Sequence, residues 1–389
     1  MKKSTISPLT TCLVMTVLSC SASFAERAET FSERLDRSEN LSASDIDAAF
    51  LTNPQTSWLD RASFGSYGEA HFATGDQADK FDIHRLVLFA SYDFTKKVRF
   101  VTEIELEHLY SNDPGTDLTW EFEQAYFEFD LGNQYTLQAG GILVPLGIIN
   151  EIHEPTTFYG VERNKIETEI IPSTFTEFGI LLRKNYDSGL QWDLAVHRGL
   201  KLDTGDMNLN GPDIRNGRQK TDTFDDPASA VTARVKYTGI EGLELAVGAQ
   251  YQDDISTGRE ENSALLTTAH FIYTTGGFSV RGLVANWQID GDAAVNGITA
   301  TGVDIDNQYG AYLEPSYKWD FDNGMAIGVF SRVLYYENED SPDGQTEYQL
   351  GVNYWPTEKI VLKADWIHED RTRGKANQDN FNFGVGYSF

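Results

Sequence analysis

The chain has 389 residues and is strongly acidic, with 31 Lys and Arg against 59 Asp and Glu and a formal net charge of −28. This sign excludes nucleic acid as a partner, because binding a phosphate backbone requires clustered positive charge. The only two cysteines, Cys12 and Cys20, both lie close to the N-terminus.

Residues 1–25 have the pattern of a cleavable secretory signal peptide. Lys2 and Lys3 form a basic start, residues 13–18 form a short apolar core, and residues 23–25 (Ser-Phe-Ala) provide a small-residue cleavage site. The apolar core is too short to cross a bilayer as a helix. Cleavage removes both cysteines, so we expect an exported chain without disulfides or thiol chemistry. Residues 26–60 are polar and poor in strand signals; we interpret them as an N-terminal periplasmic segment and assign them no function.

From residue 61 to residue 389 the apolar residues follow a period of two. In residues 98–110, for example, Phe100, Ile104 and Leu106 alternate with charged residues such as Arg99 and Glu103. Alternation of this kind places the two sets on opposite faces of a strand. A soluble β-sandwich would show the same pattern, so the alternation does not by itself identify the architecture.

The connecting segments favour a transmembrane barrel over a sandwich. Tight turns at residues 95–97, 130–133, 239–242, 274–277 and 356–359 alternate with longer, acidic loops rich in Gly and Asn. Short turns at one end and long loops at the other are typical of outer-membrane barrels. No helical segment is expected that could cover a sheet. A lipid-exposed sheet must then close on itself to satisfy its backbone hydrogen bonds.

We predict sixteen antiparallel strands, a number that leaves an aqueous channel in a barrel. The predicted strands begin near residues 62, 81, 98, 118, 134, 173, 190, 229, 243, 263, 278, 306, 325, 346, 360 and 380. Nine aromatic residues near strand ends are expected to form girdles at the membrane interfaces. They are Tyr92, Phe94, Trp192, Tyr237, Tyr273, Trp319, Tyr354, Trp355 and Tyr387.

Residues 145–172, here called the inserted loop, are far too long for a hairpin connection between two strands. Long loops inside a compact fold are usually functional, so we expect this one to fold into the barrel and form its constriction. The candidate residues of the constriction are Glu151, His153, Glu154, Tyr159, Glu162 and Arg163. Its acids could set the field that an ion crosses. Alternatively, they could hold the loop to the wall through salt bridges.

The C-terminal residues 381–389 alternate regularly and end on Phe389, which resembles the terminal strand that directs bacterial outer-membrane barrels to their assembly machinery. Four further segments, residues 64–71 (FGSYGEAH), 123–126 (EQAY), 153–163 (HEPTTFYGVER) and 215–220 (RNGRQK), resemble the phosphate-selective porin O and P superfamily. This resemblance covers roughly residues 60–389. It implies a sixteen-stranded channel, a homotrimer, whose third outer loop folds inward.

The superfamily is associated with pores lined by Arg and Lys, and this chain offers candidates for such a basic wall. They are Arg99, Arg234, Lys236, Arg281, Arg332 and Lys363. They share strands or faces with acidic residues, so the sequence does not determine which solute passes through the channel. A second basic group, Arg215, Arg218 and Lys220, lies in a long outer loop. It could attract anions, or it could be solvated charge or a contact to neighbouring loops.

No pattern in the sequence indicates catalysis, a metal site or a cofactor. Its seven histidines do not form a metal-ligand spacing, and no G-x-S-x-G motif is present. The main hypothesis is an outer-membrane porin, a passive diffusion channel for ions and small hydrophilic solutes. The alternatives are an outer-membrane barrel enzyme acting on lipid or peptide, and a plugged structural or adhesive barrel. Expected partners are outer-membrane lipid and lipopolysaccharide, which acidic loops would meet through bridging cations.

Overall fold

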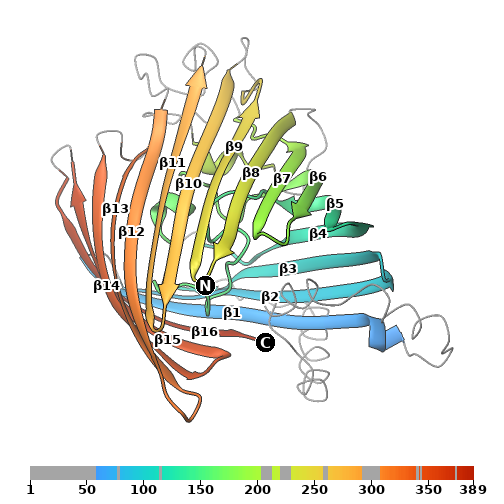
Figure 1. Ribbon diagram of the computed structural model, residues 1–389. Coiled ribbons are helices and arrows are strands. Elements are labelled where there is room, and N and C mark those ends of the chain that lie inside the picture. Colours follow the sequence, from blue (N-terminus) through green and yellow to red (C-terminus); the bar gives the residue numbers. More distant parts are fainter. Residues whose placement is uncertain are drawn as a thin grey trace, which may run out of the picture.

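Each period-two segment forms a strand that is hydrogen-bonded to the next one in chain order, and the first strand also pairs with the last. The computed structural model describes residues 58–76, 79–113, 116–202, 213–219, 229–256, 262–290, 307–338, 341, 344–372 and 375–389. Over these residues the chain is a closed antiparallel barrel of sixteen strands (Figure 1). The predicted signal peptide, nearly all of the polar segment 26–60, and Lys220 lie outside the described residues.

The strands are β1 (Ala62–Gly75), β2 (Lys80–Thr95), β3 (Val98–Ser111), β4 (Thr119–Gly132), β5 (Tyr135–Leu143), β6 (Thr176–Asn185), β7 (Leu190–Arg198), β8 (Ser229–Ile240), β9 (Leu243–Gln252), β10 (Ser263–Thr275), β11 (Phe278–Asp290), β12 (Asn307–Asp320), β13 (Ala326–Glu337), β14 (Gln345–Thr357), β15 (Ile360–Arg371) and β16 (Gln378–Ser388). Every predicted start lies within three residues of the observed one. The largest difference is at β6, which begins at Thr176.

The connections alternate in length, as predicted. β2 and β3 are joined by residues 96–97 alone, and β8 and β9 by residues 241–242, whereas the next connections along the chain are residues 112–118 and 253–262. The short turns therefore gather at one end of the barrel, which is the periplasmic end in outer-membrane barrels. The inserted loop lies within residues 144–175, between β5 and β6, and is the third connection at the opposite, outer end.

The two faces of the strands differ in polarity. Along β8, Val231 and Val235 point outward and are each 46% exposed, whereas Thr232 and Arg234 point inward and are 0% and 4% exposed. The same alternation recurs around the barrel, which gives it an apolar outer surface and a polar interior. Among the described residues, no helix is both long and apolar enough to cross a lipid bilayer.

Most of the nine predicted girdle aromatics are at least partly exposed, but one prediction is wrong. Phe94, Tyr273 and Trp319 are each at least 40% exposed close to a short turn. Trp355 is instead only 7% exposed and packs inside the barrel against Tyr159, with ring centroids 5.8 Å apart. The reason is the phase of β14, since its alternation turns this position inward next to an irregularity in the pairing with β15.

The C-terminal residue completes the closure of the sheet. The Ser66 amide donates to the Phe389 carbonyl at 3.0 Å, and the Phe389 amide donates to the Ser66 carbonyl at 2.9 Å. β16 thus lies along β1 up to the last residue (Figure 1). The terminal Phe, predicted from sequence as an assembly signal, is also part of the seam.

Candidate functional site

The inserted loop folds into the barrel and buries an apolar side against the wall. Ile166, Ile170 and Ile171 are fully buried among inward-facing residues of β10 to β13, Trp287 of β11 included. The Trp287 indole Nε1 donates to the Ile170 carbonyl at 2.8 Å. Burying three branched side chains contributes several kcal/mol of stabilisation, so this half of the loop belongs to the packed interior.

A buried carboxylate, Glu167, organises the backbone of the loop. Its Oε1 accepts from the amides of Ile148 at 2.5 Å and Ile149 at 2.6 Å, and its Oε2 accepts from the Tyr312 hydroxyl at 2.7 Å. Asn164 caps the short 3-10 helix Lys165–Glu167 by accepting from the Glu167 amide. The arrangement turns the loop back on itself before it returns to β6.

The two ends of the loop are joined by one side chain. Asn150 donates through Nδ2 to the Val144 carbonyl at 2.7 Å and accepts at Oδ1 from the Phe175 amide at 2.7 Å. This bridge also accounts for the late start of β6, because Asn150 holds the backbone of Phe175 before the regular ladder begins.

Glu151 belongs to a four-residue charge network. Its carboxylate contacts Arg183 of β6 at 2.7 Å and Arg234 of β8, and both guanidinium groups also bind Asp193 of β7. Burial alone would raise the pKa of Glu151, but Arg234 and Arg183 outweigh it and hold that pKa well below its usual range. Two carboxylates, Glu151 and Asp193, thus alternate with two guanidinium groups. Glu151 is the one residue of the four that belongs to the inserted loop, so it connects the loop to the wall.

His153 forms a second attachment, to β4 and β2. Its Nδ1 lies 3.0 Å from the Asn150 carbonyl, and its Nε2 lies 3.4 Å from Glu123 of β4. Arg85 of β2 donates to the His153 carbonyl at 2.8 Å. Burial would lower the pKa of His153, but the Glu123 carboxylate raises it to about 9, so the imidazole is cationic at neutral pH.

The middle of the loop packs against β13 to β16. The Tyr159 ring lies 5.5 Å from that of Phe330. Lys363 of β15 donates to the Gly160 carbonyl at 2.8 Å, and Asp365 accepts from the Val161 amide at 2.7 Å. Lys363 therefore holds backbone of the loop in place.

Glu162 and Glu154, the other two acids predicted for the constriction, have different surroundings. Glu162 pairs with His71 of β1 at 2.6 Å, and although burial opposes it, this imidazole lowers the pKa of Glu162 to about 2. Glu154 Oε2 is buried and has no hydrogen-bond partner among the residues that the structure describes. Of the three acids, Glu151 and Glu162 are thus bound to the wall.

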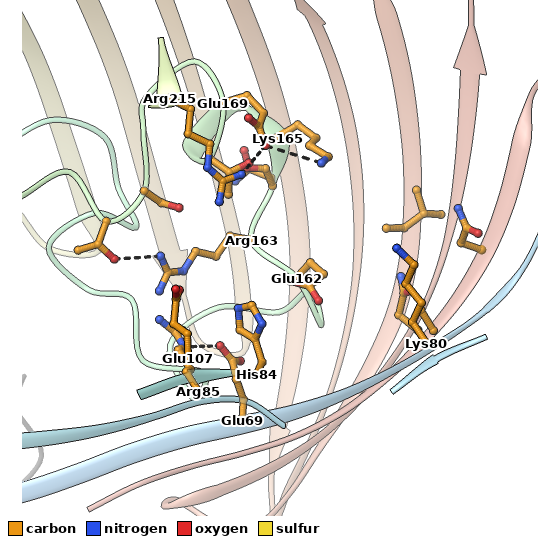
Figure 2. A pocket seen from close by; sticks show the side chains of 18 of the residues that line it. Glu69, Lys80, His84, Arg85, Glu107, Glu162, Arg163, Lys165, Glu169 and Arg215 are labelled. Atoms are coloured by element: carbon orange, nitrogen blue, oxygen red, sulfur yellow. Dashed lines mark hydrogen bonds and ion pairs between the residues drawn. The ribbon is translucent and has the colours of Figure 1, made fainter. Parts of the chain in front are cut away.

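A cavity of about 420 Å³, here called the lumen cavity, borders the inserted loop (Figure 2). On one side it is lined by loop residues between Glu162 and Thr174 together with Arg215 and Arg218. On the other sides it is lined by inward residues of β1 to β4 and β13 to β16. Carboxylates of Glu105, Glu107 and Glu121, in this part of the wall, lie within 4.8 Å of one another.

The cationic residues on the loop side of the lumen cavity have two kinds of partner, carboxylates and neutral groups. Glu169 binds Arg215 at 2.7 Å and lies 3.8 Å from Lys165, and Figure 2 shows the three side chains together. Arg163 donates instead to the Thr174 hydroxyl at 3.3 Å, and Arg218 to backbone carbonyls. Burial and the neighbouring Arg215 lower the pKa of Arg218, so a bound anion would stabilise its charge.

The six residues predicted as a basic wall all lie on the inner face, and each has a partner. The partners are Asp93 for Arg99, Glu151 and Asp193 for Arg234, Glu244 for Lys236, Glu314 for Arg281 and Arg332, and the Gly160 carbonyl for Lys363. Instead of a continuous stripe of free cations, these residues form separate ion pairs and contacts to the loop.

Sequence reasoning missed several residues that hold the loop in place. Arg183 and Asp193 alternate with apolar residues on their strands, so the sequence predicts that they point inward. It does not predict that they belong to one network with Glu151 of the loop. Glu167 had a local signal, because Asn164 and Glu167 have the spacing of a helix capping box. Glu123 stood within a segment singled out for its resemblance, yet its pairing with His153 joins positions 30 residues apart.

The comparisons with known proteins agree with this geometry. Residues 61–385 match the family described as phosphate-selective porin O and P. An uncharacterised protein of Aquifex aeolicus (strain VF5) is 27% identical over 360 residues, which cover 84% of this chain and 80% of that protein.

Two solved structures share the fold at low sequence identity. The anion-selective porin from Comamonas acidovorans has a TM-score of 0.56 and 12% identity, over 84% of this chain and 100% of its own. OmpT of Vibrio cholerae, in its trimer form, has a TM-score of 0.53 and 11% identity, over 84% of this chain and 99% of its own.

Proposed function

The chain belongs to the family of phosphate-selective porins O and P, and from this premise we propose which residues control the passage of solutes. Family membership and the closed sixteen-stranded barrel make the chain a passive channel of the bacterial outer membrane. The finer proposal is that the inserted loop forms the constriction and that small hydrophilic anions pass along its basic side.

The contacts of the inserted loop support its role as the constriction. The loop meets β4 through His153, β6 and β8 through Glu151, β13 through Tyr159, and β1 through Glu162. Contacts on so many sides of the wall keep its backbone across the lumen. A solute then passes beside the loop, where the lumen cavity lies.

The preference for anions rests on one observation: two cationic side chains of the lumen cavity have neutral partners. Arg163 and Arg218 bind a hydroxyl and backbone carbonyls, so their charge is available to a solute. Glu107 of β3 and Glu121 of β4 line the same cavity and interact electrostatically with Arg218. An anion that enters the cavity would therefore be attracted by the donors of Arg163 and Arg218 against the repulsion of these acids.

The experiment is a reversal-potential measurement in a KCl gradient on the double variant Arg163→Gln, Arg218→Gln. Unit charges about 4 Å apart interact by about 4 kcal/mol at an effective dielectric of about 20. If screening leaves a tenth of this for each residue, the chloride-to-potassium permeability ratio falls about fourfold. The shift should be largest at low salt.

The matched control is Lys318→Gln, which removes a positive charge near the periplasmic end of β12, where Lys318 pairs with Asp320 at 3.2 Å. It should leave the ratio nearly unchanged. An unchanged ratio in the double variant, or the same shift per charge in the control, would contradict the assignment of Arg163 and Arg218.

We also propose that the barrel works as a homotrimer in contact with lipopolysaccharide. The trimeric form of the Vibrio cholerae relative in fold and the apolar outer surface support this assembly. Mass measurement of the detergent-solubilised protein tests it, since a monomer at all concentrations would be evidence against it. The C-terminal strand is the element that the assembly machinery would bind.

A further inference from the structure

Two neighbouring strands depart from regular pairing at the same height near the outer end of the barrel. The register between β1 and β2 shifts between Glu69 and His71, which inserts a residue into β2. The register between β2 and β3 shifts between Ile83 and Arg85, and His108 of β3 adopts a left-handed backbone with φ of 52°. A bulge changes the direction of the side chains around it. As a result, consecutive residues of both strands, His84 and Arg85, and Glu107 and His108, line the lumen cavity.

The bulges bring two imidazoles to one carboxylate. Asp82 Oδ2 lies 2.7 Å from His108 Nδ1 and 3.1 Å from His84 Nδ1. One ligand atom from each of these three residues lies within 4.8 Å of the others. The second carboxylate oxygen, Asp82 Oδ1, is buried and has no hydrogen-bond partner among the described residues.

The positive charges near this point are paired with other acids, Lys80 with Asp113 at 2.7 Å and Arg85 with Glu69 at 2.6 Å, which leaves Asp82 to the two imidazoles. His71 stacks on the His84 ring with centroids 4.9 Å apart. Its two nitrogen atoms contact Glu69 and Glu162, so it orients His84 and remains outside the ligand set. Figure 2 shows His84 close to Glu69.

We propose that Asp82, His84 and His108 bind one divalent transition-metal ion, Zn²⁺ in the first instance, at the outer mouth of the lumen. Imidazole and carboxylate ligands suit Zn²⁺, whose tetrahedral sites have metal–ligand distances of about 2.0–2.2 Å. Ligand atoms of such a site are about 3.3 Å apart. Asp82 Oδ2 lies at hydrogen-bond distance from both Nδ1 atoms, so the carboxylate has to move aside for the ion to take its place between the two imidazoles. Three protein ligands leave the fourth position open to water or a passing solute.

The test is a calorimetric titration of the purified full-length barrel in detergent with Zn²⁺. One ion should bind per chain, and Asp82→Asn and His108→Gln should each weaken the affinity at least about tenfold. The matched control is His368→Gln, because His368 of β15 also pairs with a carboxylate, Asp379 at 3.0 Å, and is as exposed as His84. The control variant should bind Zn²⁺ like the unmodified protein.

A second measurement applies to the unmodified protein and does not depend on the folding of any variant. Co²⁺ in place of Zn²⁺ should give the intense visible absorption of a tetrahedral site, and added Zn²⁺ should abolish it. Absence of both stoichiometric binding and this spectrum overturns the proposal. Binding that is equal in Asp82→Asn, His108→Gln and the unmodified protein overturns it as well.

Discussion

The attachment of the inserted loop at Glu151 allows a sharp test, because the same loop offers a matched control. In Glu151→Gln the side chain keeps its size, but Arg183 and Arg234 lose one of the two carboxylates they share. Because the Glu151 side chain is 25% exposed and both arginines keep Asp193, we expect a loss of about 1.5 kcal/mol, between the values of exposed and fully buried ion pairs. Glu154→Gln makes the same change of charge three residues away, at a side chain whose Oε2 has no hydrogen-bond partner among the described residues.

The assay is hydrogen–deuterium exchange by mass spectrometry on the barrel embedded in lipid. A loss of about 1.5 kcal/mol in this attachment should raise the exchange rates of loop amides near position 151 about tenfold, since 1.4 kcal/mol corresponds to a factor of ten. Glu154→Gln should leave them nearly unchanged. Equal exchange rates in both variants and the unmodified protein would refute the view that Glu151 holds the loop to the wall.

The same network makes a prediction for ion selectivity. With Glu151 neutral, two guanidinium groups face Asp193 alone, so the lumen gains one positive charge. Permeability should move toward anions, most at low salt, and the open-channel current should become noisier as the loop loosens. A selectivity shift with quiet current would mean that Glu151 sets the field without holding the loop.

Two further predictions concern pH and assembly. His153 has a pKa raised to about 9, so its pairing with Glu123 stabilises the loop fully below its ordinary pKa of about 6.5 and is lost as pH rises through 9. Current noise should therefore rise between pH 6.5 and 9.5, and His153→Gln should remove this pH dependence; a pH-independent noise level in the unmodified protein would contradict it. Deleting Phe389 removes two backbone hydrogen bonds with Ser66 and should lower the amount of folded barrel in the outer membrane, and normal amounts would count against this role.

The strands were predictable because their physical cause is local. An outward face in lipid and a polar inward face impose period two on every strand, and the tight turns mark their ends. The position of the inserted loop was predictable for the same reason, since residues 145–172 interrupt the period-two pattern between two clear strands. Trp355 shows the limit of this reasoning, because an aromatic near a strand end can face lipid or the lumen, and the phase of β14 decides.

The partners inside the barrel depend on how distant strands meet the loop. The interaction of Glu151 with Arg234 joins residues 83 positions apart, and nothing local to either residue indicates it. The site of Asp82 and His108 depends on two adjacent bulges, which insert single residues into otherwise regular strands. Period-two reasoning cannot detect such an insertion unless the register of both strands is known.

The most direct test of the central claim is single-channel recording of the purified protein in a planar bilayer. The account predicts stepwise, ohmic conductance at high salt, with a reversal potential in a salt gradient that reports a preference for anions. Well-folded protein that inserts and gives no conductance steps would contradict the channel. It would favour a plugged barrel or a barrel enzyme instead.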